Sequence, residues 1–310
     1  MASVTQAQTT IDPLVELLAD FGKRRIAMDA AFFRFSLREQ QVAVFINFTL
    51  RRRNHHRILE VSAIVTSPAG VQRQVTSYPY SAIERDASGM TIGPHLWIGS
   101  TGSRGSIGPI SWDLVFESTT PLLDPQVTGG VRPFDLRMQS VPDALMSGNI
   151  TLNHRGYSFS HEGGMVGVYY GRRLPEHLYW LSANDFSDKN IVLECALMNS
   201  TIFGLPFTRM SVGYFHLRTP ETTMTIMHPL TGHIDVQGTR EELLITTRSR
   251  HNAPITAHFT ASAANFQPLD DNMVITLIGT CEIEPFGRSS MQLMQSHQGI
   301  TIAERAKNAH

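Results

Sequence analysis

Short apolar runs that alternate with polar residues follow one another along most of this chain, and turn-forming residues separate them. The run 42–50 is rich in β-branched and aromatic residues, whereas Ser-Pro-Ala-Gly at 67–70 predicts a turn. Few segments between Phe33 and Phe286 keep a helical period. Strands are expected at 33–37, 42–50, 59–65, 90–98, 110–117, 146–153, 157–168, 191–198, 210–217, 222–227, 242–248, 255–261 and 273–283. So many short strands favour all-β barrels or sandwiches over βαβ units.

The length of 310 residues exceeds what one hydrophobic core usually organises, so two β-domains are expected. Prolines and glycines crowd together between 119 and 142 and predict the boundary. We expect an N-terminal arm with a helix over 1–30, a first β-domain over 31–140, a second over 141–290 and a tail over 291–310. Asp12 and Pro13 predict the start of the helix, and 300–307 has a weak helical period.

The composition indicates a globular protein with a large buried area, because 42% of the residues are hydrophobic and only 17% are charged. The net charge of −1 gives no electrostatic footprint for nucleic acid. No stretch approaches the ~20 apolar residues of a transmembrane helix. The basic run 51–57 fits a solvated hairpin tip, with an anionic partner as the alternative. We therefore expect a cytoplasmic protein without a nucleic-acid partner or an integral membrane segment, and its oligomeric state stays open.

The two cysteines predict no metal site. Cys195 and Cys281 lie in apolar strand-like runs, which predicts buried, reduced thiols and fits a reducing compartment. The sequence has no cysteine and histidine spacing typical of zinc, no phosphate loop, no dinucleotide fingerprint and no nucleophile elbow. No cofactor is therefore expected.

The strand expected near 177–184 has two unlike faces. One face is apolar, and the other combines a large aromatic ring with two hydrogen-bonding groups. The second face consists of Trp180, Ser182 and Asn184. Such a mixture suits a ligand cavity better than a hydrocarbon core, so these three residues are expected to bind substrate.

The same region resembles the tocopherol cyclases. Gly171, Pro175, the pair Tyr179-Trp180, Asn184 and Phe186 are similar to a Gly, a Pro and an aromatic strand that precede a polar Asn in that family. The segments 202–206 and 212–217 resemble that family's apolar turn and following strand. The segment 102–114 resembles a Gly-rich hairpin of tocopherol cyclases, carotenoid 1,2-hydratases and related lipocalin-like proteins.

The resemblance implies an all-β fold of two tandem lipocalin-like antiparallel β-barrels with a short N-terminal helix. The group looks related to decalin-forming Diels–Alderases. The resemblance also implies a cavity, within or between the barrels, for an apolar substrate that is polyene-, prenyl- or polyketide-like.

One stretch departs from the family pattern. Where the family often carries charged residues and then Asn-Trp-Gly, this chain reads Gly167-Val168-Tyr169-Tyr170-Gly171. The family's proton donor is therefore absent at that place. Tyr169 is expected to line the pocket, and Tyr170 is a catalytic candidate because its hydroxyl could stabilise developing charge.

Two further catalytic candidates lie on other expected strands. Asp113 follows Trp112, so only one of the two points inward. Trp112 is expected to line the cavity, and Asp113 is an acid or a surface carboxylate. His216 has apolar neighbours, which fits a catalyst or a structural histidine, and Phe215 beside it is expected to contact substrate.

Three functions follow from these features. The first is a cofactor-independent cyclase that performs a pericyclic, Diels–Alderase-like ring closure by preorganising a polyene or polyketide-like chain. The second is an acid-catalysed hydratase or prenyl/tocopherol-type cyclase, in which Asp113, His216 or Glu282 replaces the missing donor. The third is a non-catalytic carrier of an apolar ligand. An acidic group inside the cavity would favour the second function, and a wholly apolar cavity would favour the third.

Overall fold

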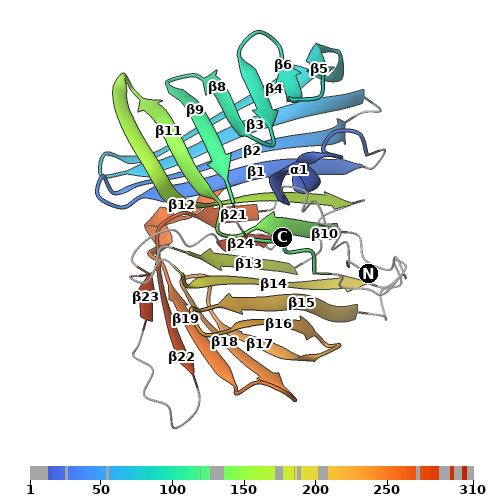
Figure 1. Cartoon of the computed structure of the whole chain (residues 1–310), viewed down its shortest axis with the longest axis vertical. Coiled ribbons are helices and arrows are strands. Elements are labelled where there is room, and N and C mark those ends of the chain that lie inside the picture. Colours follow the sequence, from blue (N-terminus) through green and yellow to red (C-terminus); the bar gives the residue numbers. More distant parts are fainter. Residues whose placement is uncertain are drawn as a thin grey trace, which may run out of the picture.

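The computed structural model describes residues 13–24, 27–53, 56–118, 120–125, 136–171, 177–184, 186, 190–201, 209–269, 273–285, 294–296 and 302–305. Within these ranges almost every element is an antiparallel strand, and α1 (Pro13–Leu18) is the one α-helix. The predicted fold class, two lipocalin-like β-barrels in tandem with a short helix, is confirmed. Figure 1 shows the two β-structures one above the other, with α1 beside β1 of the first.

The first barrel is a nearly closed sheet of 12 strands. The strands are β1 (Met28–Leu37), β2 (Val42–Arg53), β3 (His56–Ser67), β4 (Gly70–Pro79), β5 (Ile83–Arg85), β6 (Gly89–Ile92), β7 (Leu96–Gly99), β8 (Gly102–Ile107), β9 (Ile110–Glu117), β10 (Leu136–Val141), β11 (Leu145–Leu152) and β12 (Arg155–Gly171). Their order is β4-β3-β2-β1-β12-β11-β9-β8-β7-β6-β5. The first half of β12 pairs with β11, and its second half lies between β1 and β10.

The second barrel consists of two sheets. One contains β13 (His177–Ala183), β14 (Val192–Thr201), β15 (Arg209–Arg218) and β16 (Thr223–His228). The other contains β17 (Gly232–Gly238), β18 (Glu242–Ser249), β19 (Ile255–Thr260), β22 (Thr280–Pro285) and β23 (Met294–Ser296). A small third sheet of β20 (Gln267–Pro268), β21 (Met273–Thr276) and β24 (Ile302–Arg305) lies near the junction of the two barrels (Figure 1).

The first barrel extends beyond the boundary expected at residue 140. β11 and β12 follow that position in the chain, yet β11 pairs with β9 and β12 pairs with β1. In this pairing Phe32 lies opposite Gly167, so residues far apart in sequence close one sheet. At the other end, the segment with a weak helical period contains the strand β24, which pairs with β21. The weak helical period is not realised in residues 302–305, which pair with β21 instead.

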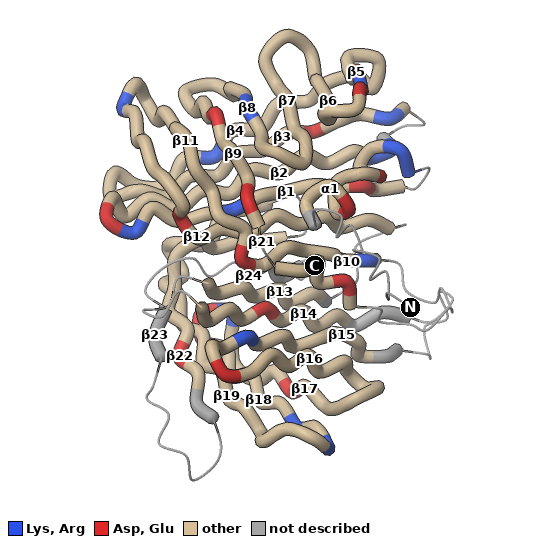
Figure 2. Tube along the Cα trace, viewed as in Figure 1, with Lys and Arg blue, Asp and Glu red and all other residues tan. Residues whose placement is uncertain are grey.

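The expectation of buried cysteines is met. Cys195 and Cys281 are free, buried thiols in the interior of the second barrel. The basic run 51–57 belongs to the β2–β3 hairpin, with Arg53 opposite His56, and its tip lies outside the described residues. Figure 2 shows the basic residues of this hairpin at one edge of the first barrel. Among the described residues, none of the helices has the length and apolar character needed to cross a membrane.

Candidate active site

The two barrels meet through a third core that belongs to neither interior. β1 places Phe33 in the first barrel and Phe32 toward the second, and β13 places Leu181 in the second barrel and Trp180 toward the first. We call this third cluster the interface core. It comprises Ala30, Phe32, Ala43, Phe45, Ile64, Met138, Met165, Tyr169, Leu178, Trp180, Ala196, Met198, Val212, Tyr214, Leu269, Met273, Ile275 and Leu277. Strands that bury both faces carry the near-continuous apolar runs seen in the sequence.

A carboxyl group lies in the interface core. Glu194 of β14 has no exposed surface. Its Oε1 accepts hydrogen bonds from Trp180 Nε1 at 3.0 Å and from the Tyr214 hydroxyl at 2.5 Å. Its Oε2 accepts one from Ser140 Oγ at 2.6 Å. Ser140 belongs to β10 of the first barrel, so the carboxyl joins the two barrels.

Burial raises the pKa of Glu194 above its ordinary value, because a buried carboxylate loses its hydration. The three hydrogen bonds and the positive charge of Arg34 lower it, but burial is the larger effect. Burial therefore favours the neutral acid, and the ionised form would find three hydrogen-bond donors in place.

A buried cation lies beside this acid. Arg34 of β1 is 2% exposed, and its Nη2 donates to Ser182 Oγ at 2.7 Å and to Asn184 Oδ1 at 3.2 Å. Asn184 Nδ2 donates in turn to the carbonyl oxygens of Pro142 at 2.9 Å and Gly164 at 2.6 Å. Charge-assisted hydrogen bonds in a buried site fix geometry strongly. These contacts therefore define how β13 sits against the first barrel.

Aromatic rings cover the remaining surface near the acid. The Phe32 and Trp180 rings meet edge to face with centroids 4.5 Å apart, and Phe32 lies 5.7 Å from Phe45 and 6.1 Å from Tyr169. Gly167 faces the Phe32 ring, and a Cβ there would lie 2.2 Å from Phe32 Cζ. A glycine at this position therefore lets the ring pack against the strand.

His216 is the cross-strand neighbour of Glu194, as Ser182 is on the other side. Its Nδ1 lies 2.9 Å from Thr225 Oγ1. Burial, and then the charge of Arg218, lower the pKa of His216 to about 4. The ring is therefore neutral near pH 7, which suits a hydrogen-bonding group better than the proton donor expected from sequence.

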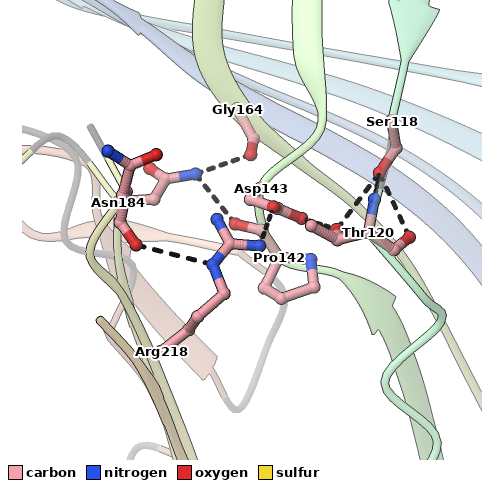
Figure 3. A network of polar contacts seen from close by, with 8 residues as sticks. Ser118, Thr120, Pro142, Asp143, Gly164, Asn184 and Arg218 are labelled. Carbon is pink, nitrogen blue, oxygen red and sulfur yellow. Dashed lines mark hydrogen bonds and ion pairs between the residues drawn. The ribbon is translucent and has the colours of Figure 1, made fainter. Parts of the chain in front are cut away.

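A polar network connects the two barrels beside the cross-strand neighbours Ser182, Glu194 and His216 (Figure 3). Asp143, between β10 and β11, forms an ion pair with Arg218 of β15 and accepts a hydrogen bond from Thr120 Oγ1. The backbone N–H of Thr120 donates to Ser118 Oγ at 3.2 Å. The network is partly exposed, so these contacts between the barrels lie near the protein surface.

The structure brings four of the predicted substrate-binding residues to the interface core. Trp180, Ser182 and Asn184 share one face of β13 and its end, as the alternation predicted, and Tyr169 lies across from them on β12. Their roles in binding stay predictions.

The other predicted residues lie elsewhere. Trp112 is buried inside the first barrel, where its Nε1 donates to Ser103 Oγ at 3.0 Å. Phe215 is buried inside the second barrel. Asp113 is exposed on the outward face of β9. Tyr170 is half-buried, with the Arg24 guanidinium 3.9 Å from its ring centroid, and burial raises its pKa.

Glu282, named as a replacement donor, faces outward on the second barrel. It lines a hollow of about 540 Å³ together with Gln237, Gly238, Thr239, Glu242, Leu244, Thr256 and His258. Glu242 Oε1 lies 3.0 Å from His258 Nε2, and the Glu242 side chain is 68% exposed. Hydrated groups of this kind do not provide a dry acid.

Sequence reasoning missed Glu194, Arg34, Tyr214 and Ser140. A usable signal existed for the first two, since each is the single charged residue in a short apolar run: Val-Leu-Glu-Cys-Ala-Leu at 192–197 and Phe-Phe-Arg-Phe at 32–35. A charge in such a run is rarely buried without a partner. Across the ranges that the structure describes, no group of three or more His, Cys, Asp or Glu could hold a metal ion.

Comparisons with known proteins report on the fold. No family model matches the sequence, and no curated protein matches it significantly. Two solved structures are similar over nearly the whole chain. A candidate AttH protein from Nitrosomonas europaea shares 11% identity at a TM-score of 0.62, covering 99% of each chain. Kievitone hydratase from Nectria haematococca shares 9% identity at a TM-score of 0.64, covering 100% of this chain and 96% of that one. The likeness supports the tandem lipocalin-like architecture.

Proposed function

We propose that this protein is an acid-catalysed hydratase or cyclase for an apolar, unsaturated substrate, with Glu194 as the proton donor. The observation that carries the proposal is the fully buried carboxyl between the barrels, whose pKa burial raises and whose two oxygens both accept hydrogen bonds. Protonating an alkene requires an acid held in a dry site, where the surrounding groups set its protonation state. This arrangement favours the acid-catalysed function over the pericyclic one.

The reaction balances without a cofactor. Glu194 gives its proton to one alkene carbon, and the π-electron pair forms the new C–H bond and leaves a cation on the adjacent carbon. A water molecule, or a hydroxyl or second alkene of the same substrate, supplies an electron pair to that cation. The added group, or a neighbouring carbon, then returns a proton to the Glu194 carboxylate. The net result is hydration or isomerising ring closure.

The surroundings of Glu194 suit both charged species of the proposed reaction, the carboxylate and the carbocation. Trp180, Tyr214 and Ser140 stabilise the carboxylate through hydrogen bonds. The rings of Trp180 and Phe32 are suited to stabilise a carbocation through their π faces. Because Glu194 is fully buried, a substrate reaches it only if the contacts between the barrels open locally.

Support from similar proteins is limited to names. One of the similar structures is named as a hydratase, and hydration is one of the two outcomes proposed here.

Pericyclic ring closure is the second candidate. It is favoured by the aromatic surface of Phe32, Phe45, Tyr169 and Trp180, which is suited to fold a flexible polyene against the barrel. This reaction would need no proton from Glu194.

Solvent labelling separates these functions. Ligands extracted from protein purified from its host are identified by mass spectrometry, and a panel of prenylated phenols and linear polyenes is then incubated with the protein in D₂O. Acid catalysis predicts a product with one new C–D bond, formed by wild type and lost in Glu194→Gln. An unlabelled cyclised product would instead indicate a pericyclic reaction, and binding without conversion would indicate a carrier.

A further inference from the structure

A second polar cluster faces the interface core from the first barrel. Asn47 and Thr49 of β2 lie two positions apart, so their side chains share one face of the strand. Asn47 Nδ2 donates to Thr49 Oγ1 at 2.9 Å and to the Tyr169 hydroxyl oxygen at 3.1 Å. Three hydrogen-bonding side chains thus meet on a surface that is otherwise apolar.

The Asn47 carboxamide keeps one acceptor open. Asn47 is 5% exposed, and among the described residues no donor lies within hydrogen-bonding distance of its Oδ1. In the reversed orientation both hydroxyls could donate to the amide oxygen, but two N–H groups would then lack acceptors instead of one oxygen lacking a donor, so the observed orientation is the favourable one. A buried acceptor without a donor costs roughly 1–3 kcal/mol. Such an atom in a folded protein calls for an explanation, and a bound molecule supplies one.

The open acceptor lies next to the surface that leads to the acid. Phe32 is the cross-strand neighbour of Asn47 on β1. The same ring lies 6.1 Å from Tyr169 and 4.5 Å from Trp180, whose indole N–H donates to Glu194. The polar cluster, the aromatic rings and the carboxyl therefore form a continuous chain of contacts along the interface between the barrels.

We propose that Asn47 Oδ1 accepts a hydrogen bond from a hydroxyl group of the ligand that binds between the barrels. This inference rests on the proposed function and adds the substrate class: an unsaturated apolar alcohol or phenol rather than a pure hydrocarbon or an ether. The hydroxyl lies at Asn47, the hydrocarbon part lies on Phe32 and Trp180, and an alkene faces Glu194. Thr49 and Tyr169 hold the carboxamide in place through its N–H groups.

A matched pair of probes tests this assignment without knowledge of the natural substrate. Geraniol carries a hydroxyl and two alkenes, and geranyl methyl ether has the same carbon chain without a donor. Binding of both to the full chain is measured by isothermal titration calorimetry. Wild type should bind geraniol roughly tenfold more tightly than the ether, the ratio expected for one buried hydrogen bond.

Variants identify the residue. Asn47→Leu should bind the two probes equally, whereas Asn47→Asp, which keeps an acceptor oxygen, should still prefer the alcohol. Asn149→Leu replaces an exposed asparagine on β11 of the same barrel and should keep the wild-type preference. The retained preference of Asn47→Asp guards against a loss that merely reflects poor folding.

The inference is overturned if geraniol fails to bind, if wild type binds both probes equally, or if Asn47→Leu keeps the preference. In those cases a water molecule occupies the acceptor or it stays empty. The outcome is independent of catalysis. Loss of labelling in Glu194→Gln together with equal binding of the probes would uphold the proposed function and reject this site. Labelling that persists in Glu194→Gln, together with an Asn47-dependent preference for geraniol, would reject the proposed function and uphold the site.

Discussion

Replacing Glu194 by glutamine should change how stability depends on pH. In the wild type, burial raises the pKa of the folded-state carboxyl above the ordinary value of 4.5. Between these two values the unfolded chain is ionised while the folded chain keeps its proton, so unfolding releases a proton. The stability from this group is therefore complete below pH 4.5 and is lost as pH rises toward the folded pKa. Glutamine keeps a carbonyl oxygen for Trp180 and Tyr214 but cannot ionise.

The slope follows from a single proton. Each pH unit within the window should lower the unfolding free energy of the wild type by about 1.4 kcal/mol relative to Glu194→Gln. Urea unfolding of both proteins over a pH series measures this difference directly. Titrations elsewhere cancel because both chains share them. Glu84→Gln, at an exposed position on β5, is the matched control for replacing a carboxylate by an amide.

A constant difference between the two proteins would refute the reasoning, because the carboxyl would then titrate equally in both states. If the wild type instead lost stability relative to Glu194→Gln as the pH fell, Arg34 and the hydrogen-bond donors would outweigh burial and keep Glu194 ionised.

Two further predictions address the packing and hydrogen bonds of the site. Gly167→Ala should destabilise the fold by about 1–3 kcal/mol, because the new Cβ would overlap the Phe32 ring. Gly156→Ala on the same strand is the control, because a Cβ there meets no atom within 4 Å and should change stability little. Urea unfolding compares the two variants, and equal effects would contradict the packing described. Tyr214→Phe removes a hydrogen-bond donor to Glu194 and should raise the pKa of that carboxyl further. The fall in stability with rising pH should then begin at the same pH as in the wild type and extend to higher pH. An unchanged pH profile of stability would contradict the role of this hydrogen bond.

The sequence predicted the fold and one face of the site because both depend on local pattern. Alternation in 177–184 assigned Trp180, Ser182 and Asn184 to one face, and that face is the one turned to the first barrel. Turn residues likewise marked most strand ends. The same alternation could not tell a barrel interior from an interface between barrels, because both bury apolar residues. For this reason Trp112 and Phe215 were expected at the site and lie inside the barrels.

The hydrogen bonds between the two barrels could not be predicted from the sequence. Arg34 and Ser182 are 148 residues apart, and Ser140 and Glu194 are 54 apart. A lone charge in an apolar strand indicates a buried group, but the partner that makes burial tolerable depends on how two sheets pack. The boundary near 140 was misplaced for a similar reason, since β12 completes the first barrel only through its pairing with β1.

The most direct test of this account is the protonation state of Glu194 in the folded protein near neutral pH. An infrared difference spectrum of wild type against Glu194→Gln, recorded in H₂O and in D₂O, reports it. We predict a carboxylic-acid C=O band in the wild type that shifts in D₂O and is absent from the variant. Carboxylate bands at the same pH, with no carboxylic-acid band, would show that the buried group is ionised and would contradict its role as the proton donor.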